Sequence, residues 1–327
     1  MRSPFTVLLL TVVLITAVCL QAKAQSQSYP PPGQMIDIGG RKLHLYCTGK
    51  GSPTVILIAG GGGFSIDWAL VQPKVAEQTR VCSYDRAGLG WSDPGPAEET
   101  VEETIDDLHA LLHGSGEKGP FILVGASIGG VFSQAYQRTF PVDIAALVFS
   151  NSANRVGFKG KDKDGLLWEL TEADLRSSFP LPTSMKNPMP TREDDPYDRL
   201  PPDLQKVRLW LDVRLWEKFD PSKATPDSLL SWRKEFLKEF DETEPGKKPP
   251  LGTLPVVVVS SNPPATDVAR HSRDEAGPRL DVLSSNTLHN TATGSGHEIH
   301  LYQPDRVIEG VLQAVTTVRS GHSLAHP

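Results

Sequence analysis

The stretch 121–130, Phe-Ile-Leu-Val-Gly-Ala-Ser-Ile-Gly-Gly, contains a serine that could act as a nucleophile. The apolar run Phe121–Val124 predicts a buried strand, and residues 130–140 predict a helix. Between them, residues 125–129 have the Gly-x-Ser-x-Gly spacing of a nucleophile elbow, although the same pattern also occurs in flexible loops. An elbow strains the serine backbone and needs small residues two positions away on each side, because strand and helix nearly touch there. We therefore expect Ser127 to present its hydroxyl at the mouth of a site.

His297 is the candidate base for this serine. A serine hydroxyl is a poor nucleophile unless a base takes its proton, and that base needs an orienting acid. His297 lies in the glycine-containing segment 294–300, expected between the last strand and the last helix, where the loop can turn the imidazole towards the sheet. His300 is the near rival, but its spacing suggests that it caps or packs at the helix start. Other histidines fall on predicted strands or helix faces, where core or surface roles are expected: His44, His109, His113, His271 and His289.

The acid that orients His297 is expected after the strand that ends at Ser260. Asp267 is the first acidic residue there and is our prediction, with Asp274 and Glu275 as later alternatives. The end of the strand 147–151 is the other candidate position, but it carries Asn151, an amide rather than a carboxylate.

A glycine run follows another apolar strand, residues 54–58, and could help to bind a developing oxyanion. Backbone N–H groups can approach a substrate closely at Gly60 to Gly63. We expect one oxyanion donor to be the Gly61 N–H and the other the N–H of Ile128, directly after the nucleophile. A phosphate-binding loop is disfavoured, because the run lacks both a Lys-Ser/Thr pair and Gly-x-Gly-x-x-Gly spacing.

Alternating strands and helices position these residues. Apolar strands and an amphipathic helix over 100–113 predict an α/β fold with a mostly parallel sheet. The composition changes over residues 153–250, which are rich in charge and tryptophan and contain two predicted amphipathic helices, 204–219 and 226–240. This segment is either a peripheral helical layer or a cap over the active site, and the two interpretations are compatible.

Composition and the N-terminus limit the function classes. The 327 residues are 39% hydrophobic and 22% charged, which is typical of a globular protein. A net charge of −6 with no basic block argues against nucleic-acid binding. Arg2, the apolar run 5–20 and the cleavage pattern Ala22-Lys23-Ala24 predict a signal peptide over residues 1–24, and hence a secreted or periplasmic protein. Cleavage would leave Cys47 and Cys82, as a disulfide or as two free thiols.

The order Ser127, Asp267, His297, together with the elbow and the glycine run, resembles the α/β-hydrolase superfamily. The loops over 84–93 and 295–305 also resemble its serine hydrolase branch of esterases, haloperoxidases and proline iminopeptidases. The resemblance implies a mostly parallel eight-stranded sheet with helices on both faces, in a domain over 25–327 with a helical cap insertion at about 153–250. It makes Asp85 and Arg86 structural. It also implies a Cys47–Cys82 disulfide, because the second and fourth strands of this superfamily are neighbours.

The resemblance also implies an activity. We expect a secreted serine hydrolase that cleaves a small carboxylic ester, or an amide or thioester, through an acyl-enzyme. It would need no metal or organic cofactor, and no stable membrane association would remain after signal cleavage. The alternative is a catalytically silent member that binds a small apolar ligand under its cap. A cofactor-free peroxidase-like activity would use the same triad.

Overall fold

The computed structural model describes residues 28–96, 100–152, 159–161, 167–169, 191–218, 251–262 and 283–324. The chain divides into two units, Met1–Pro32 and Gly33–Pro327. Of the first unit, residues 28–32 are described, and they contain no helix or strand. The predicted signal peptide, residues 1–24, lies outside the described residues. The second unit contains every element discussed below.

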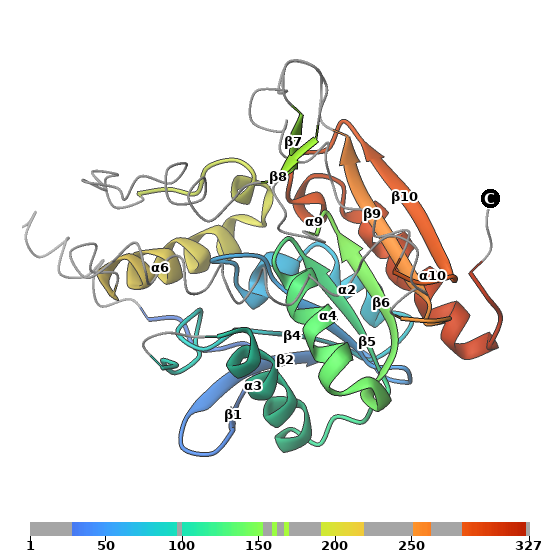
Figure 1. Cartoon of the computed structure of the whole chain (residues 1–327). Coiled ribbons are helices and arrows are strands. Elements are labelled where there is room, and N and C mark those ends of the chain that lie inside the picture. Colours follow the sequence, from blue (N-terminus) through green and yellow to red (C-terminus); the bar gives the residue numbers. More distant parts are fainter. Residues whose placement is uncertain are drawn as a thin grey trace, which may run out of the picture. The chain divides into compact units, whose positions relative to one another are not determined.

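An eight-stranded sheet forms the centre of the second unit (Figure 1). Strand β2 runs antiparallel to both of its neighbours, β1 and β4, and the remaining described pairs are parallel. This confirms the predicted mostly parallel, eight-stranded sheet. The strands, in spatial order, are β1 (Gln34–Asp37), β2 (Lys42–Thr48), β4 (Val81–Tyr84), β3 (Val55–Ile58), β5 (Phe121–Ala126), β6 (Ile144–Ser150), β9 (Val256–Asn262) and β10 (Thr287–Thr293).

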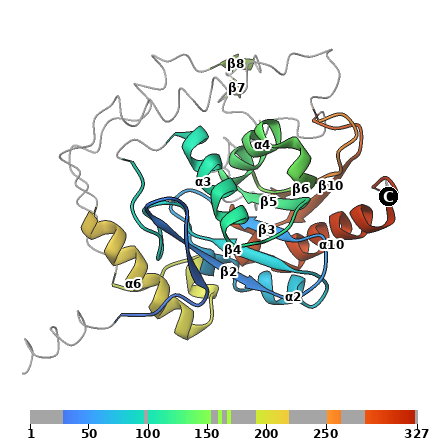
Figure 2. The same cartoon turned by 90° about the horizontal axis from the view of Figure 1, so that it is seen from below.

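Helices cover both faces of the sheet, as expected. Helices α3 (Val101–Gly114) and α4 (Gly129–Thr139) lie on one face, and α2 (Gln72–Ala76) and α10 (Pro304–Ser320) lie on the other (Figure 2). Helix α3 begins where Thr100 accepts a hydrogen bond from the Glu103 N–H and the Glu103 side chain caps the Thr100 N–H in return. Strands β3 and β5 are buried along their whole length because both faces are covered, which explains their continuous apolar sequences.

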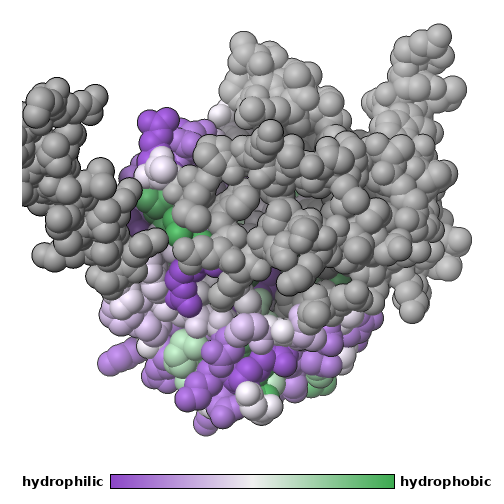
Figure 3. Space-filling model, turned by 90° about the vertical axis from the view of Figure 1, so that its left-hand side faces the viewer, coloured by the Kyte–Doolittle hydropathy of each residue, from purple (hydrophilic) through white to green (hydrophobic). Residues whose placement is uncertain are grey.

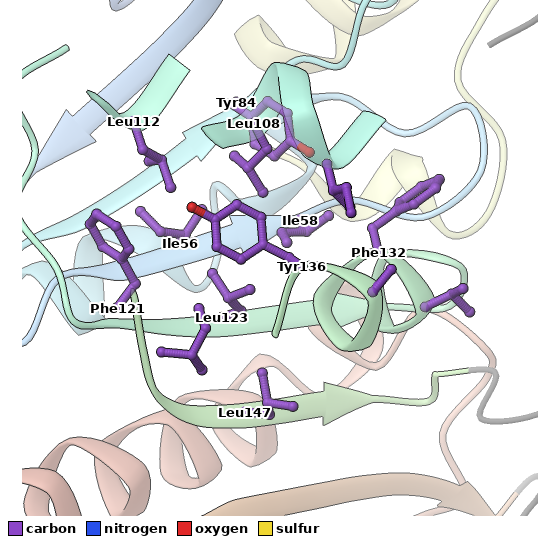
Figure 4. Packing of buried hydrophobic residues seen from close by; sticks show 14 of the residues in the cluster. Ile56, Ile58, Tyr84, Leu108, Leu112, Phe121, Leu123, Phe132, Tyr136 and Leu147 are labelled. Atoms are coloured by element: carbon purple, nitrogen blue, oxygen red, sulfur yellow. The ribbon is translucent and has the colours of Figure 1, made fainter. Parts of the chain in front are cut away.

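Two hydrophobic clusters lie on opposite faces of the sheet. On the α3–α4 face, Tyr136 of α4 points into the cluster among Ile56, Ile58 and Leu123 (Figure 4). On the other face, Trp68 and the apolar side of α10 pack against alternate residues of the same strands. The strands therefore place one set of side chains in each cluster, and the sheet is held rigidly between them.

A disulfide joins Cys47 of β2 to Cys82 of β4. The two residues are direct partners across the antiparallel pair, with their Cα atoms 4.0 Å apart. The bond ties the antiparallel strand β2 to the parallel part of the sheet.

The segment between β6 and β9 is described in part. Strands β7 (Lys159–Lys161) and β8 (Leu167–Glu169) form a separate antiparallel pair, and the predicted helix over 204–219 is α6 (Pro202–Lys218). The predicted helix over 226–240 lies outside the described residues. Leu211 of α6 packs against Phe64 and Ile66, at the carboxyl end of β3.

The surface of the described part is mostly polar. Of the large hydrophobic residues that the structure describes, only Val142 is exposed, at 86%. On the face drawn in Figure 3, the described residues are mainly hydrophilic, with scattered hydrophobic ones. No helix in the described ranges combines the length and the hydropathy that a bilayer crossing requires.

Candidate active site

Ser127 lies at the tip of β5, where the chain turns into α4. Its φ angle of 50° is in the left-handed region, which residues other than glycine rarely adopt. The Ser127 N–H donates to the Ser150 carbonyl of β6 at 3.2 Å, and its carbonyl accepts from the Gly130 N–H at 3.1 Å. These bonds hold a backbone conformation that costs on the order of 1–3 kcal/mol. The strand, sharp turn and helix predicted around Ser127 are all present.

The glycines beside Ser127 are required by close backbone contacts. A Cβ atom on Gly125 would lie 2.4 Å from the Gly130 nitrogen, and one on Gly129 would lie 2.4 Å from the Ile58 carbonyl oxygen. Both distances are far below van der Waals contact, and both involve backbone atoms that cannot move aside. Strand β5, helix α4 and the end of β3 therefore meet at the turn, as the Gly-x-Ser-x-Gly pattern predicts.

The glycine run after β3 lies against this turn. A Cβ atom on Gly60 would lie 3.3 Å from Ser127 Cβ and 4.0 Å from Ser127 Oγ. A Cβ atom on Gly61 would lie 4.0 Å from Ile128 Cγ2. The two residues proposed as oxyanion donors, Gly61 and Ile128, are therefore neighbours in space beside the serine.

Arg86 sets the orientation of the peptide groups in this loop. Its Nη1 donates to the Ala59 carbonyl at 2.6 Å, and its Nη2 donates to the Gly60 carbonyl at 2.7 Å. In a trans peptide the N–H points opposite to the carbonyl, so the bond to the Gly60 carbonyl turns the Gly61 N–H away from Arg86. The buried guanidinium also lies over the Phe132 ring, 5.2 Å from its centroid.

Asp85 connects the loop after β3 to the loop after β4. Its buried carboxylate accepts from the Ser65 N–H at 2.6 Å, the Trp91 N–H at 3.1 Å and His44 Nδ1 at 2.9 Å. His44 Nδ1 is the donor, because its Nε2 accepts from the Gly33 N–H. Asp85 and Arg86 thus bond to the loop that approaches Ser127, in the structural roles that the family resemblance implies.

His297 lies in the loop between β10 and helix α9 (Ile299–Tyr302), and Asn151 is one of its polar partners. Asn151 Nδ2 lies 3.0 Å from His297 Nδ1 and 3.2 Å from the His297 carbonyl oxygen. Asn151 directly follows Ser150, the register partner of Ala126, so Asn151 and Ser127 leave adjacent strands at the same edge of the sheet. The structure therefore brings the ends of β5 and β6 and the His297 loop together.

The three candidate acids, Asp267, Asp274 and Glu275, lie outside the described residues. The sequence favours Asp267 over Asn151 for this role because Asn151 carries an amide rather than a carboxylate. Its φ of 44° is in the left-handed region, which asparagine adopts more readily than most residues. An asparagine directly after the apolar strand β6 is therefore a sequence signal that could have predicted a sharp turn at the carboxyl end of that strand.

His300, the rival base, is buried in α9 and packs against the Trp68 ring, with 4.7 Å between the ring centroids. Burial lowers the pKa of His300 to about 3, so the imidazole stays neutral. Its contact with Trp68 indicates a packing role, as its position in the sequence suggested.

A family model described as "Alpha/beta hydrolase family" matches residues 55–309. The chain belongs to this alpha/beta hydrolase family. It is an enzyme of the hydrolase type, and the match includes β3, the elbow, His297 and the start of α10.

The individual proteins that the chain resembles have low sequence identity to it. The hydrolase is similar to the YbdG protein of Bacillus subtilis, with 22% identity over 88% of this chain and 86% of that protein. It is 34% identical to a protein of Hormonema carpetanum named as a probable transporter, and it spans only 44% of that protein's length. A solved esterase from Thermogutta terrifontis shares the fold, with a TM-score of 0.57 and 20% identity over 85% of this chain and 94% of that chain.

A buried charged cluster connects α6 of the hydrolase to the loop after β3. Arg208, 4% exposed, donates to Asp67 at 2.8 Å, Glu193 at 3.1 Å and Asp212 at 2.5 Å. Burial raises the pKa of all three carboxyl groups, that of Glu193 to about 7. Asp67 also accepts from the Phe64 N–H at 2.9 Å, directly after the glycine run. No local sequence pattern indicates this cluster, and the sequence analysis missed it.

Apolar side chains surround this connection. Leu211 and Trp210 of α6 pack with Phe64 and Ile66 of the loop after β3, and Trp91 of the loop after β4 joins them. Helix α6 of the segment 153–250 therefore lies at the carboxyl ends of β3 and β4. This position fits a cap with an apolar inner side.

Two groups in the described residues have metal-ligand side chains close together. One contains Cys47 and Cys82, whose sulfurs are already bonded to each other. The other contains His109, His113 and Asp143 and lies at the amino end of β6. Ser127 follows the carboxyl end of β5, so this group and Ser127 are at opposite ends of the parallel strands. Neither group adjoins the elbow.

Proposed function

We propose that this hydrolase is an exported serine hydrolase that cleaves a carboxylic ester of a small molecule through an acyl-enzyme. The observation that carries the proposal is Ser127 at φ 50°, at the end of β5 and against the Gly60–Gly61 loop. A serine held in this strained position has its hydroxyl at the edge of the sheet, where the loops can form an oxyanion site.

The chemistry follows from these residues. Ser127 Oγ attacks the ester carbonyl while His297 takes the hydroxyl proton. The Gly61 and Ile128 N–H groups stabilise the tetrahedral oxyanion, and the C–O bond to the leaving alcohol breaks as His297 returns the proton. Water, deprotonated by His297, then attacks the acyl-Ser127 ester and releases the acid. Amides and thioesters could react by the same steps.

Two elements of the proposal concern the rest of the chain. The predicted signal peptide over residues 1–24 makes the protein secreted or periplasmic, and the Cys47–Cys82 disulfide is consistent with an oxidising compartment. The segment at about 153–250 is proposed as the cap, because α6 packs at the carboxyl edge of the sheet. Asp267 remains the sequence-based prediction for the triad acid.

A fluorophosphonate probe tests the proposal, because it phosphonylates only activated serines. We expect the wild type to be labelled and Ser127→Ala not to be. Ser133→Ala is the matched control, since its hydroxyl bonds to the Gly129 carbonyl within α4 and should not affect labelling. Labelling that persists in Ser127→Ala would refute the assignment of the nucleophile.

One observation favours a second candidate function, a silent member that binds a small apolar ligand under the cap. The Asn151 amide is one polar neighbour of His297 Nδ1, at 3.0 Å, at a place where an active triad would have a carboxylate. Folded wild type that no fluorophosphonate labels, but that binds apolar fluorescent ligands, would support this alternative.

A further inference from the structure

Three side chains at the amino end of β6 have the chemistry of a metal site. His109 and His113 are four residues apart on α3, so their rings project from the same face of the helix. Asp143 is the last residue of a short 3₁₀ turn, η2 (Pro141–Asp143), directly before β6. One potential ligand atom of each of these three residues lies within 4.8 Å of the other two. Imidazole nitrogens and carboxylate oxygens are common ligands of Zn²⁺ in proteins.

The spacing of the ligand atoms suits a tetrahedral zinc ion. Asp143 Oδ2 lies 3.3 Å from His109 Nδ1 and 3.7 Å from His113 Nε2. Zinc bonds to nitrogen and oxygen are about 2.0–2.2 Å long, which places neighbouring ligands of a tetrahedral ion about 3.3–3.6 Å apart. The distance to His113 is slightly longer than this and too long for a hydrogen bond. The His113 side chain is 57% exposed, so a small rotation of its ring brings all three atoms around one ion.

Packing orients two of the three ligands in advance. The His109 ring stacks on the Phe140 ring, with 3.9 Å between the centroids and 9° between the planes. The Asp143 N–H donates to the Phe140 carbonyl at 3.1 Å, which fixes the backbone of Asp143. The hydroxyl of the buried Tyr136 donates to Asp143 Oδ2 at 3.3 Å and lies 3.1 Å from His109 Nδ1. Hydrogen-bonded neighbours of this kind hold the ligands of metal sites in place.

The charges around the group also favour a cation. Burial and the neighbouring His113 lower the pKa of His109, so its imidazole is neutral at pH 7. The neutral ring has a nitrogen lone pair, which is the form that binds a metal. The negative charges of Asp143 and Asp106 act on His109 in the opposite direction, and the same charges attract a divalent cation.

We propose that His109, His113 and Asp143 form a zinc-binding site that connects α3 to the start of β6. The site lies at the opposite end of the parallel strands from Ser127, so the ion takes no part in the proposed ester cleavage. Three protein ligands leave one position of a tetrahedral ion for water. His109 and Asp143 are 34 residues apart in sequence, so the unfolded chain does not present the site, and zinc should stabilise the folded state.

Titration calorimetry with ZnCl₂ tests the proposal on chelator-treated protein without a polyhistidine tag. We expect the wild type to bind one zinc ion per chain at this site. His113→Ala and Asp143→Asn should each weaken this binding by at least about 100-fold, because the loss of even an outer partner of a ligand commonly costs about 10–100-fold. His322→Ala is the matched control, because His322 is an exposed histidine outside the group, and it should bind zinc as the wild type does.

Urea unfolding shows whether the ion connects the two elements or only adheres to the surface. Above the Kd, each tenfold rise in free zinc should raise the stability of the wild type by the same increment. The increment should be absent in His113→Ala, whose exposed side chain can be removed without unfolding the protein. Zinc that binds the wild type but leaves its urea midpoint unchanged would overturn the proposed connection.

The outcomes at this site are independent of those at Ser127. Wild type that binds no zinc, or that binds it no more tightly than His113→Ala and Asp143→Asn do, would overturn the site. Ser127→Ala should bind zinc as the wild type does, and His113→Ala should be labelled by fluorophosphonate as the wild type is. Loss of labelling throughout the series would therefore count against the proposed function alone.

Discussion

Replacing Arg208 with methionine should destabilise the protein by an amount that grows with pH. Methionine fills part of the same volume but removes the cation between Asp67, Glu193 and Asp212. Asp67 is only 2% exposed, and burial already raises its pKa, a rise that Arg208 opposes. Without Arg208, the buried Asp67 carboxyl must keep its proton in the folded state.

The magnitude follows from that proton. The unfolded chain releases it above a pKa of about 3.9, so the folded variant binds one more proton than the unfolded chain does. Stability therefore falls as pH rises, by about 1.4 kcal/mol per unit. Measured against a carboxyl with an ordinary pKa, the proton costs about 1.5 kcal/mol at pH 5 and about 4 kcal/mol at pH 7, and these values are upper bounds on the loss relative to the wild type, in which burial already raises the Asp67 pKa. Glu193 and Asp212 act in the same direction, because burial raises their pKa values too.

Urea unfolding at pH 5, 6 and 7, followed by the fluorescence of the six tryptophans, measures this dependence. Arg192→Met is the matched control, because the Arg192–Asp194 pair is exposed, at 82% and 75%. Its stability should change by less than about 0.5 kcal/mol at every pH. The reasoning is refuted if Arg208→Met is destabilised equally at pH 5 and pH 7, or by less than about 1 kcal/mol at pH 7.

Two further predictions concern the framework of the site. Gly125→Ala should lose about 3 kcal/mol or more, because its Cβ would lie 2.4 Å from the Gly130 nitrogen, whereas the Cβ of Gly61→Ala would meet only Ile128 Cγ2 at 4.0 Å. Equal urea midpoints for these two variants would contradict the packing argument. The Cys47→Ala/Cys82→Ala double variant should lose about 4 kcal/mol in a chain-entropy estimate, because the disulfide spans a sequence separation of 35 residues. Unfolding with and without reductant provides the comparison, and identical midpoints for the wild type would show that the bond does not constrain the chain.

The elements of the fold were readable from the sequence because their signals are local. A continuous apolar run predicted β5, and helical spacing over 100–113 predicted α3, which spans Val101–Gly114. The elbow was also local, since Gly125, Ser127 and Gly129 lie within five consecutive residues and the steric demand acts between them. The mostly parallel sheet followed from the alternation of strands and helices.

The side-chain pairs in and around the site could not be predicted from local sequence patterns. Asn151 and His297 are 146 residues apart in sequence, and Arg208 and Asp67 are 141 residues apart. No periodicity relates residues at such separations, and burial alone turned an ordinary helix arginine into the centre of a cluster of three carboxyl groups. The requirement for a carboxylate excluded Asn151 from the sequence-based prediction of the acid. Asparagine suits this position for another reason: the chain makes a left-handed turn at the end of β6.

The sequence by itself therefore determined the hydrolase framework and the place of Ser127 in it, because short-range sterics and hydrophobic periodicity act along the chain. Only the tertiary structure decided what stands beside His297 and what connects α6 to the glycine loop. Those contacts depend on which strand ends and helices the packed sheet brings together.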